Sequence, residues 1–342
     1  MNNNSTKTVY VFAIDLGKST FHACSQNRQG KLIKRYKLTA NKLKQTLSQL
    51  PPCIVAMEAC AGAHYWAQVS KQFGHDARLI SPQFVKPFVK SNKNDQVDAE
   101  AIAEASVRPS MRFVPIKSKE QQSLQALHRA RQSLVHQKTA QANQIRGFLL
   151  EFGITIPIGA RCFRRDLPMI LEDGENTLTV FIRQLIHQLW QHWQNLEQQV
   201  DQLQNQIEQL AKQNSSCRSL MTIPGVGPLT ASALVSKVGD SKEFKNGREL
   251  AAYLGLVPRQ HSTGGKQTLL GISKRGDIYL RTLLIHGARA VLQFARDKTD
   301  RLSQWLNSLA ERRGRNIAAV ALANKNARIA WCILTREEAY QL

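Results

Sequence analysis

Four carboxylates in the first hundred residues have the chemistry and the spacing of a metal site. Asp15 and Glu58 each end an apolar run that is typical of a buried strand. Asp95 and Asp98 lie three residues apart in a helical pattern, so they share one face of that helix. Acids at the ends of neighbouring strands, faced by acids on a helix, can hold two hard cations over a phosphodiester. The four residues therefore predict metal-dependent chemistry on a nucleic acid.

Taken singly, these carboxylates also have ordinary explanations. An Asp-Leu-Gly sequence at a strand end, as at Asp15, also occurs where sugar kinases and actin-like ATPases turn around phosphate, and Glu58 could be a surface acid near a helix. Asp95 could cap a helix, and Asp98 could favour its positive end. Glu100 and Glu104 lie further along the same pattern and suit a solvated face. The order of the three contexts together favours the metal site.

A second candidate for chemistry is the polar segment 259–266. Ser262 and Thr263 precede Gly264 and Gly265, and these glycines allow a hydroxyl to be presented on a close backbone. The basic residues around them could screen a phosphate during attack: Arg259, Lys266, Lys274 and Arg275. A loop that only grips a phosphate explains the same residues, because geometry is needed to recognise a hydroxyl nucleophile.

The elements that would position the carboxylates alternate between strand and helix over residues 8–117. Near-continuous apolar character predicts that 54–57 is a central strand. A three-strand meander followed by strand–helix–strand units matches the ribonuclease H type of α/β fold. The expected strands are 9–16, 19–25, 32–38, 54–57 and 77–80, and the expected helices are 42–50 and 62–73.

Two long helices are expected in the middle of the chain, at about 118–152 and 178–212, with a break at 157–174. The second carries an apolar heptad seam, which favours a coiled coil. Few charges flank the seam to specify a partner. Self-association and a helical hairpin within one chain therefore remain equally open. The seam residues are Ile182, Ile186, Leu189, Trp193, Leu196, Val200, Leu203, Ile207 and Leu210.

A helical region is expected to follow residue 214. Its first turn contains Gly225 and Gly227 in the pattern of a helix-hairpin-helix, where glycines let the backbone approach a phosphate. A plain helical hairpin is the alternative. Three more helices are expected at 278–296, 300–312 and 316–334.

The charge of the chain points to a polyanionic partner. The 342 residues include 47 Lys and Arg against 25 Asp and Glu, a net charge of +22. Residues 258–336 alone hold 15 basic and 4 acidic residues, or +11. This concentration favours a nucleic-acid surface, to which Arg281 would also contribute.

Other sequence features bear on the compartment. The first eight residues are polar and do not form a signal peptide, and no apolar stretch of about 18 residues predicts a membrane span. The six cysteines form no C-x-x-C pair and are most simply the thiols of a cytosolic protein. We therefore expect no membrane partner and a cytoplasmic protein.

Six stretches, taken in order, closely resemble one family. It is the DEDD-type transposases of the insertion-sequence one-ten family, and the segment around Ser262 is similar to the eleven-eleven subgroup. The matching stretches are 13–17, 57–59, 94–99, 223–227, 255–266 and 272–277.

The resemblance implies three regions. Residues 1–117 would be a ribonuclease H-like, resolvase-like catalytic domain, whose tetrad Asp15, Glu58, Asp95 and Asp98 binds two Mg²⁺ or Mn²⁺ ions. Residues 118–214 would be a long-helix coiled coil. Residues 215–342 would be a C-terminal transposase domain that bears a serine nucleophile.

Members of the family are prokaryotic DNA recombinases that excise and insert their own element, so the resemblance implies a nucleoid-associated protein. A structured non-coding RNA guides them by pairing with donor and target DNA. The resemblance further implies a homo-oligomer, a dimer or tetramer, with a composite active centre in which serine forms a 5′-phosphoserine link. Ser262 is the expected nucleophile, Thr263 is the fallback, and Ser273 is a nearby hydroxyl suited to a control.

Two other functions fit parts of the sequence. A metal-dependent structure-specific nuclease, such as a junction resolvase, would need the carboxylates but neither Ser262 nor Thr263. A non-catalytic nucleic-acid-binding protein would tolerate the loss of Asp15. An actin-like phosphotransferase is disfavoured, because no second glycine-rich phosphate loop is evident and the net charge is strongly positive.

Overall fold

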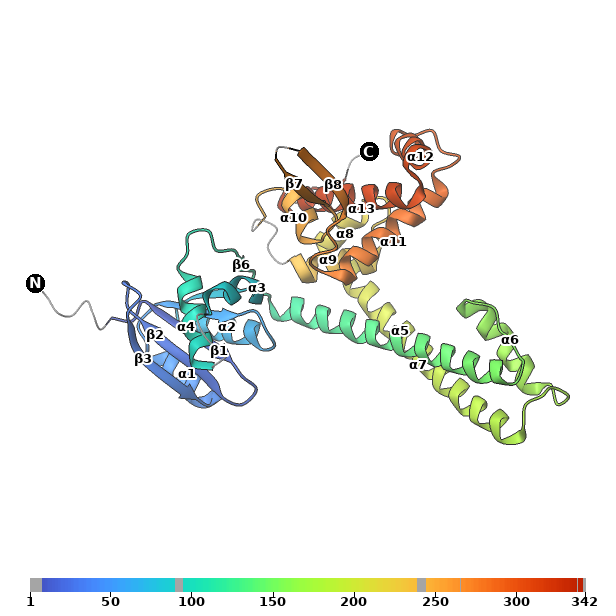
Figure 1. Cartoon of the computed structure of the whole chain (residues 1–342), viewed down its shortest axis with the longest axis horizontal. Coiled ribbons are helices and arrows are strands. Elements are labelled where there is room, and N and C mark those ends of the chain that lie inside the picture. The colour runs from blue at the N-terminus through green and yellow to red at the C-terminus, as the bar shows by residue number, and fades with distance from the viewer. Residues whose placement is uncertain (1–7, 90–94, 239–243, 265, 337, 341–342) are drawn as a thin grey trace, which may run out of the picture. The chain divides into compact units, whose positions relative to one another are not determined.

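The computed structural model describes residues 8–89, 95–238, 244–264, 266–336 and 338–340, without the side chains of Asp95, Gln96 and Lys266. The chain divides into two compact units, Met1–Ser118 and Lys119–Leu342. The first unit is an α/β sandwich, and the second is built mainly of helices (Figure 1).

The first unit is built on one mixed sheet in the order β3-β2-β1-β4-β5-β6. The first three strands form an antiparallel meander, and β4 and β5 run parallel to β1. This arrangement is consistent with the predicted ribonuclease H-like fold. The strands are β1 (Val11–Leu16), β2 (Phe21–Gln26), β3 (Leu32–Leu38), β4 (Ile54–Glu58), β5 (Asp76–Ile80) and β6 (Phe113–Val114).

Different helices cover the two faces of this sheet. Phe12, Ile14 and Met57 pack with α1 (Ala40–Gln49) and α2 (Ala63–Gln72). The alternate residues, including Ala13 and Ala56, pack with α4 (Asp95–Ser106). Both faces of β1 and β4 are therefore buried, which explains why their sequences are continuously apolar rather than alternating. The short helices α3 (Pro82–Val85) and η1 (Lys86–Phe88) follow β5.

The heptad seam finds its partner within the chain. Helix α7 (Val180–Gln213) packs along α5 (Lys119–Glu151) as an antiparallel pair (Figure 1). One row of the seam is almost fully buried, at Ile186, Trp193, Val200 and Ile207. The other row is less covered, and Leu210 is 40% exposed. The pairing observed is thus the intramolecular hairpin that the sequence left open.

The expected break at 157–174 is wrong in part, because it contains helix α6 (Ala160–Glu172). Pro168 lies inside this helix and removes one backbone donor. Burial offsets that loss, since Phe163 and Leu167 are fully buried. Phe163 packs edge-on against Trp190 and Trp193, which stack on each other with centroids 5.1 Å apart.

The rest of the second unit is a helical cluster around one apolar core. A two-stranded hairpin, β7 (Pro258–Thr263) and β8 (Lys266–Ile272), projects from it. The three last helices lie within two residues of their predicted ends. The helices are α8 (Ser215–Met221), α9 (Pro228–Val238), α10 (Gly247–Tyr253), α11 (Ile278–Phe294), α12 (Arg301–Arg313) and α13 (Arg315–Arg336).

Helix α13 is the one described helix that is long and apolar enough to cross a membrane. It supplies Ala319, Leu322, Ala323 and Ala330 to the core of the second unit. Its apolar character is thus that of a core helix.

A buried polar network ties α5 to the helical cluster. His128 Nε2 lies 3.0 Å from Ser232 Oγ, whose hydroxyl donates to the Pro228 carbonyl at 2.7 Å. His128 Nδ1 lies 3.0 Å from Tyr279 Oη. Because the Ser232 proton is already donated, Nε2 donates to Ser232 and Nδ1 accepts from Tyr279, which is the pattern of a neutral imidazole.

This network predicts acid sensitivity. Burial, with the nearby charges of Arg131 and Lys237, lowers the pKa of His128 from 6.5 to about 4. Between pH 6.5 and 4 the His128 imidazole is therefore protonated in the unfolded chain but neutral in the folded protein. The free energy of unfolding therefore decreases as the pH falls through this window. The contribution is about 3 kcal/mol. Urea unfolding at pH 7 and pH 4 should show a smaller pH dependence in His128→Gln than in wild type. Equal pH dependence in the two proteins would contradict the prediction.

Candidate functional site

Two of the four predicted carboxylates lie next to each other on the sheet of the first unit. Strands β1 and β4 are parallel neighbours with Ile14 opposite Met57 in register. Asp15 and Glu58 each follow by one residue, so they occupy adjacent positions where both strands end. By strand alternation both side chains fall on the face that α4 covers, the face of Ala13 and Ala56.

The electrostatics of a nearby thiol support this placement. Partial desolvation raises the pKa of Cys60, and the negative charges of Glu58 and Asp15 raise it further. Both carboxylates therefore act on this thiol, which agrees with their adjacent positions on β1 and β4. Both carboxylates are half-buried, which concentrates negative charge at this edge of the sheet.

Helix α4 carries the other two carboxylates. Asp98 is half-buried and precedes Ala101, Ile102 and Ala105, which pack against the sheet at 0–2% exposure. Their three- and four-residue spacing places Asp98 on the sheet-facing side of the helix. Asp95 is the first residue of α4, but its side chain lies outside the described part of the structure.

The donor chemistry of this edge fits a hard divalent cation, since carboxylate oxygens are the preferred ligands of Mg²⁺ and Mn²⁺. Asp15 and Glu58 are brought together, and Asp98 lies on the covering helix. Among the side chains that the structure describes, no three Asp, Glu, His or Cys residues gather closely enough to hold an ion. The four-carboxylate set stays a prediction, since the side chain of Asp95 lies outside the described residues.

The segment 259–266 is part of a hairpin rather than the loop that the sequence suggested. Thr263 pairs with Lys266, so the turn of the hairpin begins at Gly264. Gly264 has a φ of +55°, a conformation that glycine adopts at no steric cost. Gly265 and the side chain of Lys266 lie outside the described residues. Every residue of β7 is exposed, so the hairpin presents its side chains to solvent.

Ser262 and Thr263 project from opposite faces of the hairpin, because adjacent strand residues alternate. Ser262 lies on the face of Gln260, whose side-chain amide donates to Ser262 Oγ at 2.8 Å. Gln267 is the partner of Ser262 on β8. Thr263 lies on the face of His261, whose partner is Thr268. Each hydroxyl therefore has a distinct polar environment.

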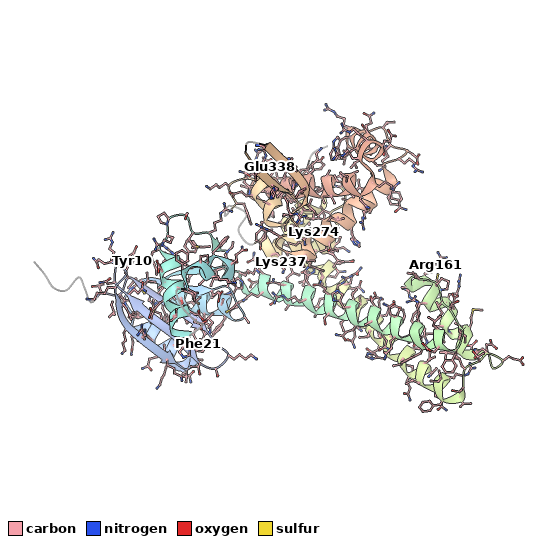
Figure 2. The ribbon with its side chains drawn as sticks, in the orientation of Figure 1. Tyr10, Phe21, Arg161, Lys237, Lys274 and Glu338 are labelled. Atoms are coloured by element: carbon pink, nitrogen blue, oxygen red, sulfur yellow. The ribbon has the colours of Figure 1, made fainter. Side chains whose placement is uncertain are left out.

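The predicted basic residues divide into exposed and buried ones. Arg259, Lys274 and Arg275 are exposed on the hairpin and just after it, and Lys274 is labelled in Figure 2. Arg281 is only 7% exposed, and its guanidinium donates to the carbonyls of Leu254 and Arg275, both at 3.0 Å. Arg281 therefore anchors the segment that follows the hairpin and is not a surface contact for a nucleic acid.

The glycine turn between α8 and α9 has a packing role on one side. Gly225 has a φ of +84°, and a Cβ there would lie 2.7 Å from the Gly287 carbonyl oxygen of α11. Asn326 donates to the Pro224 carbonyl at 2.8 Å, which fixes the turn from α13. Gly227 is exposed with open space around it. A helical hairpin is thus present, and Gly227 is its accessible glycine.

Sequence reasoning missed two residues beside these sites. His22 is the register partner of Asp15 on β2 and shares its face of the sheet. Gln260 lies on the Ser262 face of the hairpin and donates to the Ser262 hydroxyl. The pairing of β1 with β2 reveals His22, and the side-chain hydrogen bond to Ser262 reveals Gln260. In the sequence, the tight turn at Gly17 between two strands was a signal that could have pointed to His22.

The two functional regions coincide with matches to known families. Residues 12–154 match the DEDD_Tnp_IS110 model, described as a transposase. Residues 217–304 match a model described as the transposase IS116/IS110/IS902 family. The first range contains all four carboxylates, and the second contains the glycine turn and the whole hairpin.

The chain is also similar along its length to individual bacterial proteins. It is 48% identical over 332 residues to a "Probable family 20 transposase" of Pseudomonas aeruginosa, covering 96% of this chain and 97% of that protein. It is 46% identical over 337 residues to the transposase for insertion sequence element IS1111A of Coxiella burnetii, covering 98% and 93%. A pilin gene-inverting protein of Moraxella lacunata is 25% identical over 313 residues, covering 83% of each chain.

Proposed function

The chain belongs to the IS116/IS110/IS902 family of transposases, and from this membership we propose that it excises and inserts a mobile DNA element under the guidance of a structured RNA. As a transposase it is a DNA recombination enzyme. The observation that carries the proposal is the placement of Asp15 and Glu58 side by side at one edge of the sheet, under the helix that bears Asp98.

A DEDD transposase domain implies the use of divalent metal ions. In our proposal these are two Mg²⁺ or Mn²⁺ ions, and Asp15, Glu58, Asp95 and Asp98 hold them. When bound, such ions would stabilise negative charge on a phosphate and favour the deprotonated form of a nearby hydroxyl. The protein's own part would be to supply these carboxylates from the sheet and from α4.

The nucleophile we assign is Ser262. Its Oγ attacks the phosphorus of the scissile phosphodiester, an Oγ–P bond forms, and the bond from phosphorus to the 3′ oxygen breaks. The serine proton is lost, and the departing 3′ oxygen gains one, so the 5′ phosphate remains on the protein. Attack by another 3′-hydroxyl on this phosphoserine reverses these bonds and joins the strands without an external energy source. Gln260 supports this assignment, because its amide donates to Ser262 Oγ and orients the hydroxyl.

RNA guidance is what the family resemblance implies, and the distribution of positive charge is compatible with it. Half of the net charge lies within residues 258–336, and contacts from Lys and Arg to a phosphate backbone carry little sequence information. Base pairing with a guide would then supply the choice of site. The exposed helices and the hairpin would hold RNA and DNA in a homo-oligomer, with the carboxylates of one subunit acting beside the serine of another.

The test is a recombination assay with purified protein, donor DNA, target DNA and Mg²⁺. The RNA is transcribed from the DNA that flanks the gene, and a scrambled RNA of equal length is the control. Joined product is expected only with the flanking RNA and not in EDTA. Equal product with scrambled RNA would remove guidance from the proposal and leave a transposase that reads its sites through protein contacts.

A further inference from the structure

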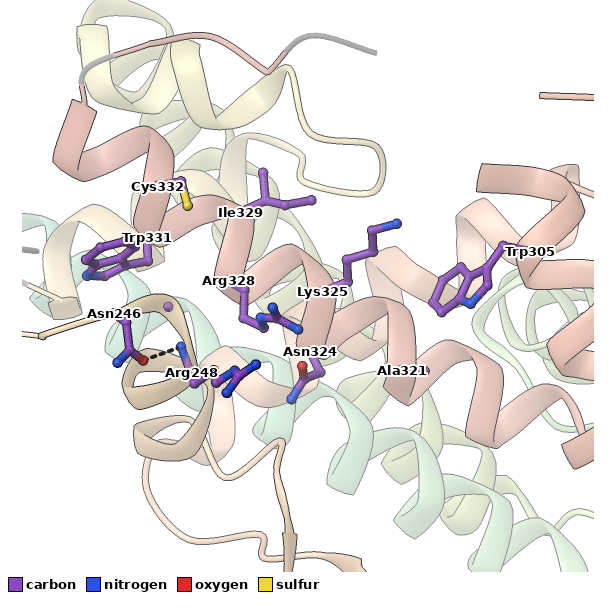
Figure 3. Close-up of a pocket in the computed structure, with 11 residues that line it drawn as sticks. Asn246, Arg248, Trp305, Ala321, Asn324, Lys325, Arg328, Ile329, Trp331 and Cys332 are labelled. Atoms are coloured by element: carbon purple, nitrogen blue, oxygen red, sulfur yellow. Dashed lines mark hydrogen bonds between the residues drawn. The ribbon is translucent and has the colours of Figure 1, made fainter. Parts of the chain in front are cut away.

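A pocket on the second unit lies apart from the hairpin and has the features of a nucleic-acid site. It has a volume of about 620 Å³ and is formed by α10, α12 and α13 (Figure 3). The residues that line it are Asn246, Gly247, Arg248, Trp305, Ala321, Asn324, Lys325, Arg328, Ile329, Trp331 and Cys332. Three of them are cations, and none is acidic.

Two of the cations are brought together by close helix packing. A Cβ at Gly247 would lie 2.8 Å from the carbonyl oxygen of Arg328 and 2.9 Å from its Cα, so only glycine lets α10 approach α13 at this point. Arg248 is the next residue, and Figure 3 shows it beside Arg328 on the same side of the pocket. Both side chains are exposed, and no ion pair involves either of them within the described residues. Like charges held together in this way favour an anion between them.

The other end of the pocket offers an aromatic surface. Trp305 of α12 is 37% exposed. Lys325 Nζ lies 4.9 Å from the centre of its ring, so a cation and an exposed indole are adjacent. The remaining polar side chains are already engaged, since Asn324 donates to the Leu256 carbonyl and Trp331 donates to that of Phe244. The groups that stay available are three cations and one indole face.

We propose that this pocket binds a single-stranded segment of nucleic acid, with phosphate on Arg248 and Arg328 and a base stacked on Trp305. An indole beside unpaired cations is the combination that single-strand binders use, because every base has a face to stack and every nucleotide has a phosphate. The absence of acidic lining residues favours this polyanion over a cationic or neutral ligand. The inference rests on the proposed function in that recombination on a guide exposes unpaired strands.

The test measures binding of full-length protein to labelled oligonucleotides of about ten nucleotides, in EDTA so that cleavage is excluded. DNA, RNA and abasic versions of one length are compared. Trp305→Leu is expected to weaken binding of the base-containing strands by about tenfold and to leave the abasic strand unchanged. Phe181→Leu is the matched control, because Phe181 is a highly exposed aromatic on α7. Equal affinity of wild type and Trp305→Leu for every strand would overturn the proposal.

The proposed contacts of Arg248 and Arg328 to phosphate have a separate test. Arg248→Gln combined with Arg328→Gln should weaken all three strands alike and reduce the salt dependence of log K by about 1.4, as expected for two lost contacts to a single strand. Arg312→Gln with Arg313→Gln removes equal charge at the end of α12, outside the pocket. An equal loss in this control would mean diffuse attraction and would overturn the site. Circular dichroism melting confirms that each variant is folded.

The DNA and RNA arms identify the source of the strand. Tighter binding of RNA assigns the pocket to the guide, and tighter binding of DNA assigns it to a donor or target strand. The binding readout uses neither the hairpin nor a metal ion. If the pocket variants bind every strand as tightly as wild type while wild-type recombination proceeds, this site alone is refuted. If the variants lose binding as expected while the wild-type protein does not recombine, the proposed chemistry alone is refuted.

Discussion

Replacing Asp15 with asparagine is expected to reduce DNA strand cleavage by at least about a thousandfold. The substitution keeps the size of the side chain and removes the negative charge from the edge that it shares with Glu58. A divalent ion held by carboxylates stabilises phosphate charge by several kcal/mol, and each 1.36 kcal/mol is a factor of ten in rate. Cleavage of a labelled donor duplex over time, with the flanking RNA and Mg²⁺ present, measures the effect.

The matched control is Glu104→Gln. Glu104 is also an acid of α4, but it forms an ion pair with Arg108 at 2.6 Å and lies further along the helix. Its loss should change cleavage less than about threefold, because a surface pair contributes little. DNA and RNA binding should be retained in both variants. Full cleavage by Asp15→Asn would remove Asp15 from the active centre and would favour a protein that binds nucleic acid without metal chemistry.

Replacing Ser262 with alanine is expected to abolish the covalent protein–DNA link, a loss of at least about a thousandfold. The substitution removes the attacking oxygen, and no other group on that face of the hairpin is a comparable nucleophile, since Gln260 carries an amide. A 5′-labelled strand that stays with the protein through denaturing electrophoresis reports the link. The same variant should still bind RNA and DNA, because the basic residues are unchanged.

Two neighbouring hydroxyls make this experiment specific. Thr263 lies one residue away but on the opposite face of the hairpin, and Ser273 lies beyond β8 with its amide donating to the Val257 carbonyl. Thr263→Ala and Ser273→Ala should both retain the link. A link lost only in Thr263→Ala would transfer the nucleophile to Thr263. Metal-dependent cleavage that never forms a link, in any of these proteins, would instead identify a nuclease that uses water.

The adjacency of Asp15 and Glu58 was predictable from sequence because local patterns determine it. Continuous apolar runs before Asp15 and Glu58 indicate buried central strands, and the three-residue spacing of Asp95 and Asp98 indicates a shared helix face. Parallel neighbours then end at the same edge of the sheet. The detailed pairing that adds His22 to this edge depends on register, which the composition of a strand does not determine.

Other features could not be predicted, because they depend on tertiary packing. The heptad seam of α7 shows that a partner exists but not that α5 is that partner. The hairpin of β7 and β8 is polar and exposed, so it lacks the alternation by which strands are recognised. Pro168 indicated a break, whereas burial of Phe163 and Leu167 retains the helix. A count of charges places Arg281 on a binding surface, whereas its hydrogen bonds hold it inside.

The exposure of the β7–β8 hairpin has a consequence for the conditions under which the protein could react with DNA. Within the described residues β7 and β8 pair with no third strand, and every residue of β7 is exposed; a two-stranded ribbon is marginally stable in water. In the proposed role of Ser262, holding its hydroxyl in one reactive geometry would therefore require contacts beyond the hairpin itself. Assembly on the correct nucleic acids would provide them, and reactivity would then be conditional on recognition. A free subunit would then react slowly with unrelated DNA, because the conformational entropy of the hairpin opposes the reactive geometry until the correct nucleic acids bind.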